Sequence, residues 1–274
     1  MGELQKAQFD ADAKELFFGL SKEAHSDAEL YACPRCRDTG WLVTEQGARL
    51  CACESQVRLL KQRREAGLKP AMDEMCFTNF DLNYYAPERQ LRPGYSYRQA
   101  AEKALRAAKA FVAACLLGEN TRGLYYEGNL GSGKTFLAAA IAGELLERGR
   151  MARFVVVPEF LEQLRLSYRG EYNNEYDEAE IMRSAMSAPV LVLDDLGAHN
   201  SSPWTVGKIY TLLNYRLNTC KPCIITSNLK PAALAEELGP RAASRIKGMC
   251  DRYILLTEKD IRTRKEDAGS GWQI

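Results

Sequence analysis

The sequence predicts an α/β fold in which helices flank a central parallel sheet, preceded by a small N-terminal module. Three observations predict this architecture: short apolar strands alternate with helices, a phosphate-binding motif joins one strand to the next helix, and four cysteines cluster ahead of both. Strand and helix alternation of this kind is typical of a parallel sheet covered on both faces. We expect residues 1–70 to form the module and residues 71–274 the α/β domain.

The composition is that of an ordinary soluble globular protein. The chain has 274 residues, 46% of them hydrophobic and 27% charged, and its formal net charge is +1, so global charge gives no sign of a nucleic-acid-binding protein. No apolar run approaches the ~18 residues of a membrane span, and the acidic N-terminus does not resemble a signal peptide. We therefore expect a cytoplasmic protein with no membrane partner, in which nine cysteines indicate metal ligands or buried thiols.

The N-terminal module contains a cysteine pattern suited to zinc. Two close pairs, Cys33 with Cys36 and Cys51 with Cys53, are separated by fourteen residues. Residues 40–44 and 48–51 are predicted strands of a hairpin with one pair at each root. Four thiolates can complete the tetrahedron that structural Zn²⁺ requires, although C-x-C replaces C-x-x-C in the second pair. The predicted role is to hold a small interaction module.

A phosphate-binding motif lies between a predicted strand at residues 123–127 and a predicted helix at residues 136–146. Its members are Gly128, Asn129, Leu130, Gly131, Ser132, Gly133, Lys134 and Thr135. In such a loop the backbone N–H groups and the helix dipole face an anion. Lys134 is predicted to reach the β and γ phosphates of ATP, and the Thr135 hydroxyl to bind Mg²⁺.

A second apolar run, residues 190–193, predicts a strand buried on both faces. Asp194 and Asp195 follow it, at the sheet edge where ligands of α/β folds bind. We expect Asp194 to hold Mg²⁺, directly or through water. Asp195 is the candidate for orienting or polarising the attacking water.

The remaining elements continue the alternation. We predict strands at 152–157 and 223–226 and helices at 158–168, 178–187, 203–218 and 241–247. Asn228, just after the second of these strands, is a candidate contact to the γ phosphate or the catalytic water. Arg241 and Arg245 lie on the last helix, and spacing alone does not place them.

Together these motifs resemble the AAA+ ATPases with their P-loop core. Within that class they are most similar to the bacterial and phage replicative helicase loaders (DnaC/DnaI-like), which are related to the IstB-like transposition helper ATPases. The resemblance covers most of the chain and rests on residues 33–41, 77–85, 128–135, 193–197, 226–228 and 241–245. It implies that no full helical lid follows the core, because only 46 residues come after Asn228.

The resemblance also implies residue roles. Lys134 and Thr135 would belong to Walker A, Asp194 to Walker B, and Asn228 would be sensor 1. Asp195 stands where many AAA+ enzymes have glutamate, and its shorter side chain implies slow hydrolysis until the protein assembles or meets DNA. Arg245, with Arg241 as the alternative, would be an arginine finger that acts on the nucleotide of a neighbouring subunit. Such a role requires self-association through the ATPase domain.

The function that the resemblance implies is ATP-dependent loading of a hexameric replicative DNA helicase of the DnaB type onto single-stranded DNA. The zinc module favours this over a transposition helper that binds duplex DNA with a transposase. Two other hypotheses stay open: a nucleotide-switched adaptor with negligible hydrolysis, and a zinc-dependent nucleic-acid module with a vestigial ATPase.

Overall fold

The computed structural model describes residues 33, 35–37, 39–44, 47–168 and 178–263. The chain divides into two units, Met1–Glu65 and Ala66–Ile274, which are described separately below. Of the predicted N-terminal module, residues 1–32 lie outside the described part, as do residues 45 and 46 of the predicted turn.

The first unit contains the predicted hairpin. Strands β1 (Trp41–Thr44) and β2 (Gly47–Leu50) are antiparallel, which confirms the prediction to within one residue at each end. Helix α2 (Ala52–Glu65) follows the hairpin. An acidic residue in its first turn and two arginines in its last turn complement the helix dipole.

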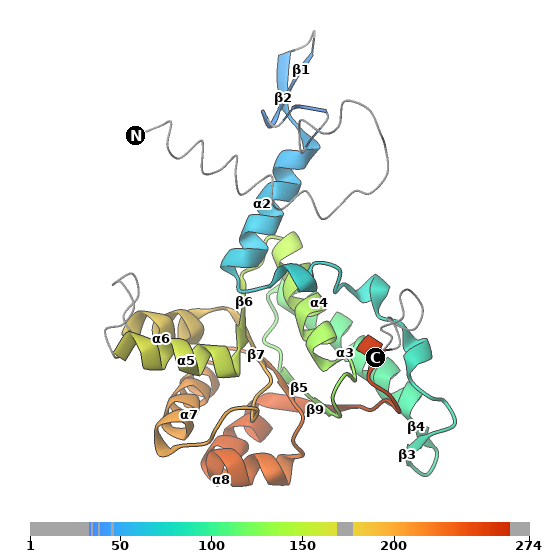
Figure 1. The fold of residues 1–274 in the computed structure, drawn as a ribbon, viewed down its shortest axis with the longest axis vertical. Coiled ribbons are helices and arrows are strands. Elements are labelled where there is room, and N and C mark those ends of the chain that lie inside the picture. The colour runs from blue at the N-terminus through green and yellow to red at the C-terminus, as the bar shows by residue number, and fades with distance from the viewer. Residues whose placement is uncertain (1–32, 34, 38, 45–46, 169–177, 264–274) are drawn as a thin grey trace, which may run out of the picture. The chain divides into compact units, whose positions relative to one another are not determined.

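The second unit is built on a parallel sheet with the strand order β6-β7-β8-β5-β9 (Figure 1). The strands are β5 (Gly123–Gly128), β6 (Ala152–Val156), β7 (Val190–Asp194), β8 (Cys223–Ser227) and β9 (Cys250–Leu255). β5 therefore has a neighbour on each side, β8 and β9, and the loop that follows it leaves the interior of the sheet. β5 to β8 correspond to predicted strands, whereas β9 was not predicted.

Helices cover both faces of this sheet. They are α3 (Tyr97–Leu117), α4 (Lys134–Glu147), α5 (Val157–Tyr168), α6 (Glu178–Ser187), α7 (Pro203–Asn218) and α8 (Pro231–Met249). α3 packs against α4 on one face, while α5 to α8 form a continuous layer on the other. Of these, α3 was not predicted. Its N-terminus is fixed by a capping box of Ser96 and Gln99, and Gly118 ends it in a left-handed conformation.

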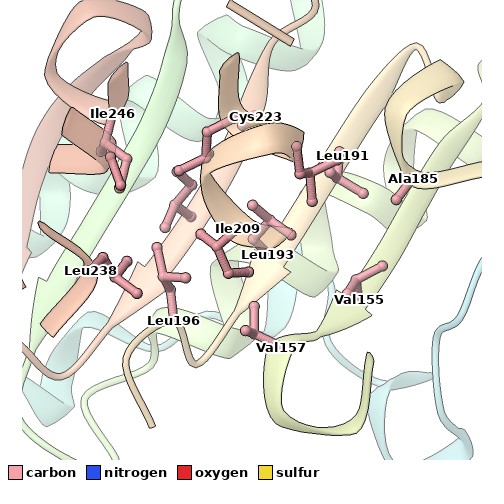
Figure 2. Close-up of a cluster of buried hydrophobic side chains, with 14 of the residues drawn as sticks. Val155, Val157, Ala185, Leu191, Leu193, Leu196, Ile209, Cys223, Leu238 and Ile246 are labelled. Carbon is pink, nitrogen blue, oxygen red and sulfur yellow. The ribbon is translucent and has the colours of Figure 1, made fainter. Parts of the chain in front are cut away.

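The core under α5 to α8 explains why the apolar runs form strands here. Leu191 and Leu193 of β7 point toward this layer and pack with Ile209 of α7 and Ile246 of α8 (Figure 2). Both leucines are fully buried. Strand side chains alternate between faces, so the intervening Val192, which is equally buried, lies on the α4 side. A run buried on both faces is what a central parallel strand requires.

The second unit begins at Ala66, and several short elements precede α3. These are the 3₁₀ turns η2 (Pro70–Met72), η3 (Phe77–Asn79) and η4 (Leu82–Tyr84), and the two-stranded ribbon of β3 (Gln90–Arg92) and β4 (Tyr95–Ser96).

After β8, the described chain forms only α8, β9 and a short segment ending at residue 263. No helical lid follows the sheet within that part of the chain. No helix among the described residues is long and apolar enough to cross a membrane.

Candidate nucleotide-binding site

The phosphate-binding motif connects β5 to α4, and two of its glycines are required by close approaches. A Cβ at Gly128 would lie 1.7 Å from the carbonyl oxygen of Leu255 on β9. Gly133 adopts a φ of 87°, and a Cβ there would lie 2.6 Å from the Tyr85 hydroxyl. Any side chain would therefore displace a neighbouring strand or ring. These contacts hold the loop tightly between the sheet and the segment before α3.

Tyr85 supports the loop from outside. Its hydroxyl donates to the carbonyl of Ser132 at 2.8 Å, and its ring packs on Phe80, with the centroids 5.6 Å apart. Burial raises the pKa of the Tyr85 phenol far above its usual range, so the hydroxyl stays a donor at physiological pH. Because this bond occupies an outward carbonyl, it fixes the loop without using the N–H groups that an anion needs.

Lys134 is buried at the start of α4. Its Nζ donates to the carbonyl of Asn129 at 2.7 Å and to that of Gly128 at 3.1 Å, with the Ser132 hydroxyl at 3.4 Å. Burial lowers the pKa of the ammonium group, and the two aspartates after β7 oppose that effect. The cation is thus held inside the loop, where its charge can act on a phosphate chain.

Thr135 and Asp194 meet as a Mg²⁺ site would require. The Thr135 hydroxyl donates to the two carboxylate oxygens of Asp194 at 2.9 and 3.2 Å. Burial raises the pKa of Asp194 to about 6, while hydrogen bonds from Thr226 and Thr135 act to lower it. A hydroxyl and a carboxylate are hard oxygen donors, so this pair fits Mg²⁺, which prefers one or two protein ligands together with phosphate and water oxygens.

Thr226 is a site residue to which sequence reasoning gave no role. Its hydroxyl donates to Asp194 Oδ1 at 2.7 Å and accepts the backbone N–H of Asp195 at 2.9 Å. One side chain on β8 therefore orients both acidic residues at the end of β7. Residues 226–228 are one of the motifs on which the family resemblance rests, which was a signal, but the predicted contact to the nucleotide was Asn228.

Asp195 and Asn228 lie at the same edge of the sheet, directly after β7 and β8, and neither side chain has a described hydrogen bond to the loop. Asp195 adopts a φ of 56°, a left-handed conformation that aspartate tolerates better than most residues, and is half-buried. Asn228 follows β8 directly and is exposed; within the described residues its side chain has no hydrogen-bond partner. Both are available to a ligand at this edge.

The two candidate fingers lie on α8, and no described contact joins them to the loop. Arg245 donates through Nε to Asn214 Oδ1 at 2.9 Å and lies over the Tyr210 ring, so α7 holds it. Arg241 is exposed one turn earlier. The structure thus brings together the loop, Asp194 and Thr226, with Asp195 and Asn228 beside them. No described contact links either arginine to this group.

The four cysteines of the first unit converge. Their sulfur atoms all lie within 4.8 Å of one another and all four side chains are buried. Cys33 and Cys51 are 3.8 Å apart, and Cys36 and Cys53 are 3.3 Å apart, between Sγ atoms. A tetrahedron with zinc–sulfur bonds of ~2.3 Å has edges of ~3.8 Å. The cluster therefore fits a tetrahedral metal ion and could hold zinc.

The fold is a P-loop ATPase fold of the AAA+ type. The phosphate loop follows the inner strand β5, the carboxylate pair follows β7, and β8 lies between these two strands. Helices cover both faces of the sheet. The IstB-like ATP binding protein family matches residues 79–257, more than half of the 274 residues. The chain belongs to this family.

Two of the proteins to which the chain is similar are named as replicative helicase loaders. The chain is 36% identical to the replicative helicase loader DnaI of Bacillus subtilis over 114 residues, 41% of this chain and 35% of that protein. It is 24% identical to the replicative helicase loader DnaC of Escherichia coli over 224 residues, 80% of this chain and 84% of that protein. A crystal structure of DnaI superimposes with a TM-score of 0.56 at 27% identity, covering 72% of this chain and 99% of that one.

Proposed function

We propose that this protein is an ATP-dependent helicase loader. It binds a hexameric replicative DNA helicase through the N-terminal unit and assists its placement on single-stranded DNA. The observation that carries the proposal is the presence, in one chain, of a four-cysteine module and an intact nucleotide site. The names of the relatives DnaI and DnaC support it.

In the proposed cycle, Lys134 binds the β and γ phosphates, while Thr135 and Asp194 hold Mg²⁺. Mg²⁺ supplies charge neutralisation of the phosphates when bound. Asp195 orients the attacking water and Asn228 contacts the water or the γ phosphate. Asp195 is shorter than the glutamate of many AAA+ enzymes, so hydrolysis is slow until assembly or DNA completes the site. The ATPase domains self-associate. Their positively charged side chains contact the phosphate backbone of the single-stranded DNA.

The hairpin of the first unit presents an apolar face suited to a client protein. Trp41 is 52% exposed, Val43 is 86% exposed and Leu50 is 59% exposed. Trp41 pairs with Leu50 across the hairpin, and Val43 is two residues from Trp41, so the three side chains share one face. Leu42, on the opposite face, packs against the cysteines. An exposed aromatic flanked by aliphatic side chains is a common centre of a protein interface.

Trp41→Ala is expected to weaken binding to the replicative helicase by about 30-fold, because a central interface tryptophan contributes on the order of 2 kcal/mol or more. The measurement is an affinity titration of the full chain against the helicase hexamer. Met151→Ala is the matched control, since Met151 is also an exposed large apolar residue, 70% exposed, but lies in the second unit. Equal affinity of the Trp41 variant and the wild type would exclude this face as the contact.

Cys51→Ser is expected to release zinc and unfold the first unit while the ATPase domain stays folded. Structural zinc contributes on the order of 10 kcal/mol to the folding of a small module, and residues 1–65 form a unit of their own. Metal analysis of the purified chain and hydrogen exchange of β1 and β2 test this. Cys220→Ser is the control, because Cys220 is an exposed cysteine outside the cluster. A wild-type chain purified without zinc, yet protected in β1 and β2, would contradict the zinc site.

The decisive experiment is co-elution of the full chain with a replicative helicase hexamer, in ATP analogue and in ADP. Nucleotide-dependent helicase binding that Cys51→Ser removes supports the loader. The second candidate function is that of a transposition helper ATPase. One observation favours it, because the matching family is described as IstB-like. Binding to a transposase and not to the helicase would establish that transposition helper role instead. Helicase binding with no hydrolysis, with or without DNA, would identify a nucleotide-switched adaptor.

A further inference from the structure

The chain that follows β9 turns back onto the phosphate-binding loop. We call residues 256–263 the C-terminal strap. Asn129 of the loop donates through Nδ2 to the carbonyl of Thr257 at 2.8 Å and accepts the backbone N–H of Thr257 at 3.1 Å. Further along, the N–H of Ile261 donates to the carbonyl of Gly131 at 3.1 Å. The strap is therefore attached to the loop at two points.

Between these points the strap brings a carboxylate against the loop. A Cβ built on Gly131 would lie 1.9 Å from Oδ1 of Asp260 and 2.0 Å from its Cγ. Glycine at 131 thus leaves the space that the Asp260 carboxylate uses. A fixed negative charge beside an anion-binding loop is unfavourable once a phosphate chain arrives, so the carboxylate needs a compensating cation.

Arg262 is that cation. It donates to Asp260 Oδ1 through its backbone N–H at 2.9 Å and through Nε at 3.1 Å, and to Oδ2 through Nη2 at 2.9 Å. The guanidinium group binds the carboxylate in the forked geometry that it also uses for phosphate. Its side chain is otherwise exposed, so the group is free to exchange one anion for another.

The electrostatic surroundings of Arg262 are those of the nucleotide site. The hydrogen bond to Asp260 raises the pKa of Arg262, and the charge of Asp195 raises it further. The pKa of Lys134, lowered chiefly by burial, is lowered also by Arg262. The guanidinium group therefore lies within electrostatic reach of both the loop lysine and the carboxylate proposed to orient water.

We propose that Arg262 is a nucleotide-contacting residue that binds the terminal phosphate of ATP within its own subunit, exchanging Asp260 for the phosphate. The inference rests on the proposed ATP binding and adds a residue that distinguishes ATP from ADP. A γ phosphate offers Arg262 more negative charge than a carboxylate does, and the same charge repels Asp260. The strap thereby supplies a cation to the nucleotide site from the same chain.

Arg262→Ala is expected to weaken binding of a non-hydrolysable ATP analogue by ~10- to 100-fold, the range of one charge-assisted contact, and to change ADP affinity less than about twofold. Fluorescent-nucleotide titration of the full chain measures both. Arg262→Lys keeps the charge without the fork and should fall between the alanine variant and the wild type. Asp260→Asn removes the repulsion and should bind the ATP analogue more tightly than the wild type.

Arg148→Ala is the control, because Arg148 is an exposed arginine in a surface ion pair with Glu144, 2.7 Å long, at the far end of α4. It should leave both affinities unchanged. Equal loss of ATP and ADP affinity in Arg262→Ala, or no loss of either, would overturn the inference while leaving ATP binding intact. A wild-type chain that binds neither nucleotide would instead contradict the proposed function itself.

Discussion

Lys134→Ala is expected to reduce ATP hydrolysis at least ~100-fold, the usual effect of removing a preorganised charge from a reacting phosphate or oxyanion. The ammonium group is buried and its hydrogen-bond partners are the Gly128 and Asn129 carbonyls and the Ser132 hydroxyl. No other lysine among the described residues has a described hydrogen bond to this loop. The measurement is steady-state ATPase with single-stranded DNA present, together with ATP affinity.

The variant should keep its fold, because the loop conformation depends on other contacts. Gly128 and Gly133 fit against the sheet and Tyr85, and Tyr85 binds the Ser132 carbonyl. Lys221→Ala is the control, since Lys221 is a half-buried lysine outside the loop that donates to the Ser187 carbonyl at 2.7 Å. Hydrolysis in Lys134→Ala equal to that of the wild type would show that the loop is not the catalytic phosphate site.

The sequence predicted the elements whose hydrophobic pattern is the same along their whole length. β7 is apolar at every position before its final aspartate because both of its faces are covered, and the loop motif lies between a buried strand and an alanine-rich helix. In such elements local pattern and tertiary environment agree. The cysteine pairs were predictable for a similar reason, since metal geometry limits their spacing.

β9 was not predicted from the sequence because it is an edge strand that carries charged residues. It pairs with β5 alone, and Asp251 and Arg252 are exposed on it. Arg252 forms two hydrogen bonds with the buried Glu127 of β5, 2.5 and 2.6 Å long. Those charges are stabilised by partners 125 or more positions away, which no local pattern contains.

The candidate site likewise combines residues that a local motif identifies with residues whose role depends on distant partners. Loop and carboxylates were predictable because each is a contiguous motif, whereas Thr226 acquires its role from the pairing of β8 with β7, which sets its hydroxyl beside Asp194. The strap is the extreme case. Asp260 meets Gly131 across 129 positions of sequence, and a short charged segment at a chain end gives no sign of such a contact.

Arg245→Ala is expected to reduce assembly-stimulated hydrolysis by ~10³- to 10⁵-fold, the effect of losing an arginine finger. No described contact joins Arg245 to the phosphate loop of its own subunit, so its action on ATP requires a neighbour. Arg245 lies on α8, and its hydrogen bond to Asn214, 2.9 Å long, and its position over the Tyr210 ring hold its side chain against α7. Asn214→Ala should therefore cause a smaller loss, through misplacement of the arginine alone.

Subunit mixing separates action in trans from a structural role. Lys134→Ala has an inactive loop and an intact Arg245, and Arg245→Ala has the reverse, so each is inactive alone. Mixed assemblies should regain hydrolysis, because some interfaces combine an intact loop with an intact finger. No regain in mixtures that co-assemble would show that Arg245 acts within its own subunit or only stabilises α8. Arg241→Ala decides between the two candidates: if Arg241 is the finger, it will complement Lys134→Ala, and Arg245→Ala will retain most of its activity.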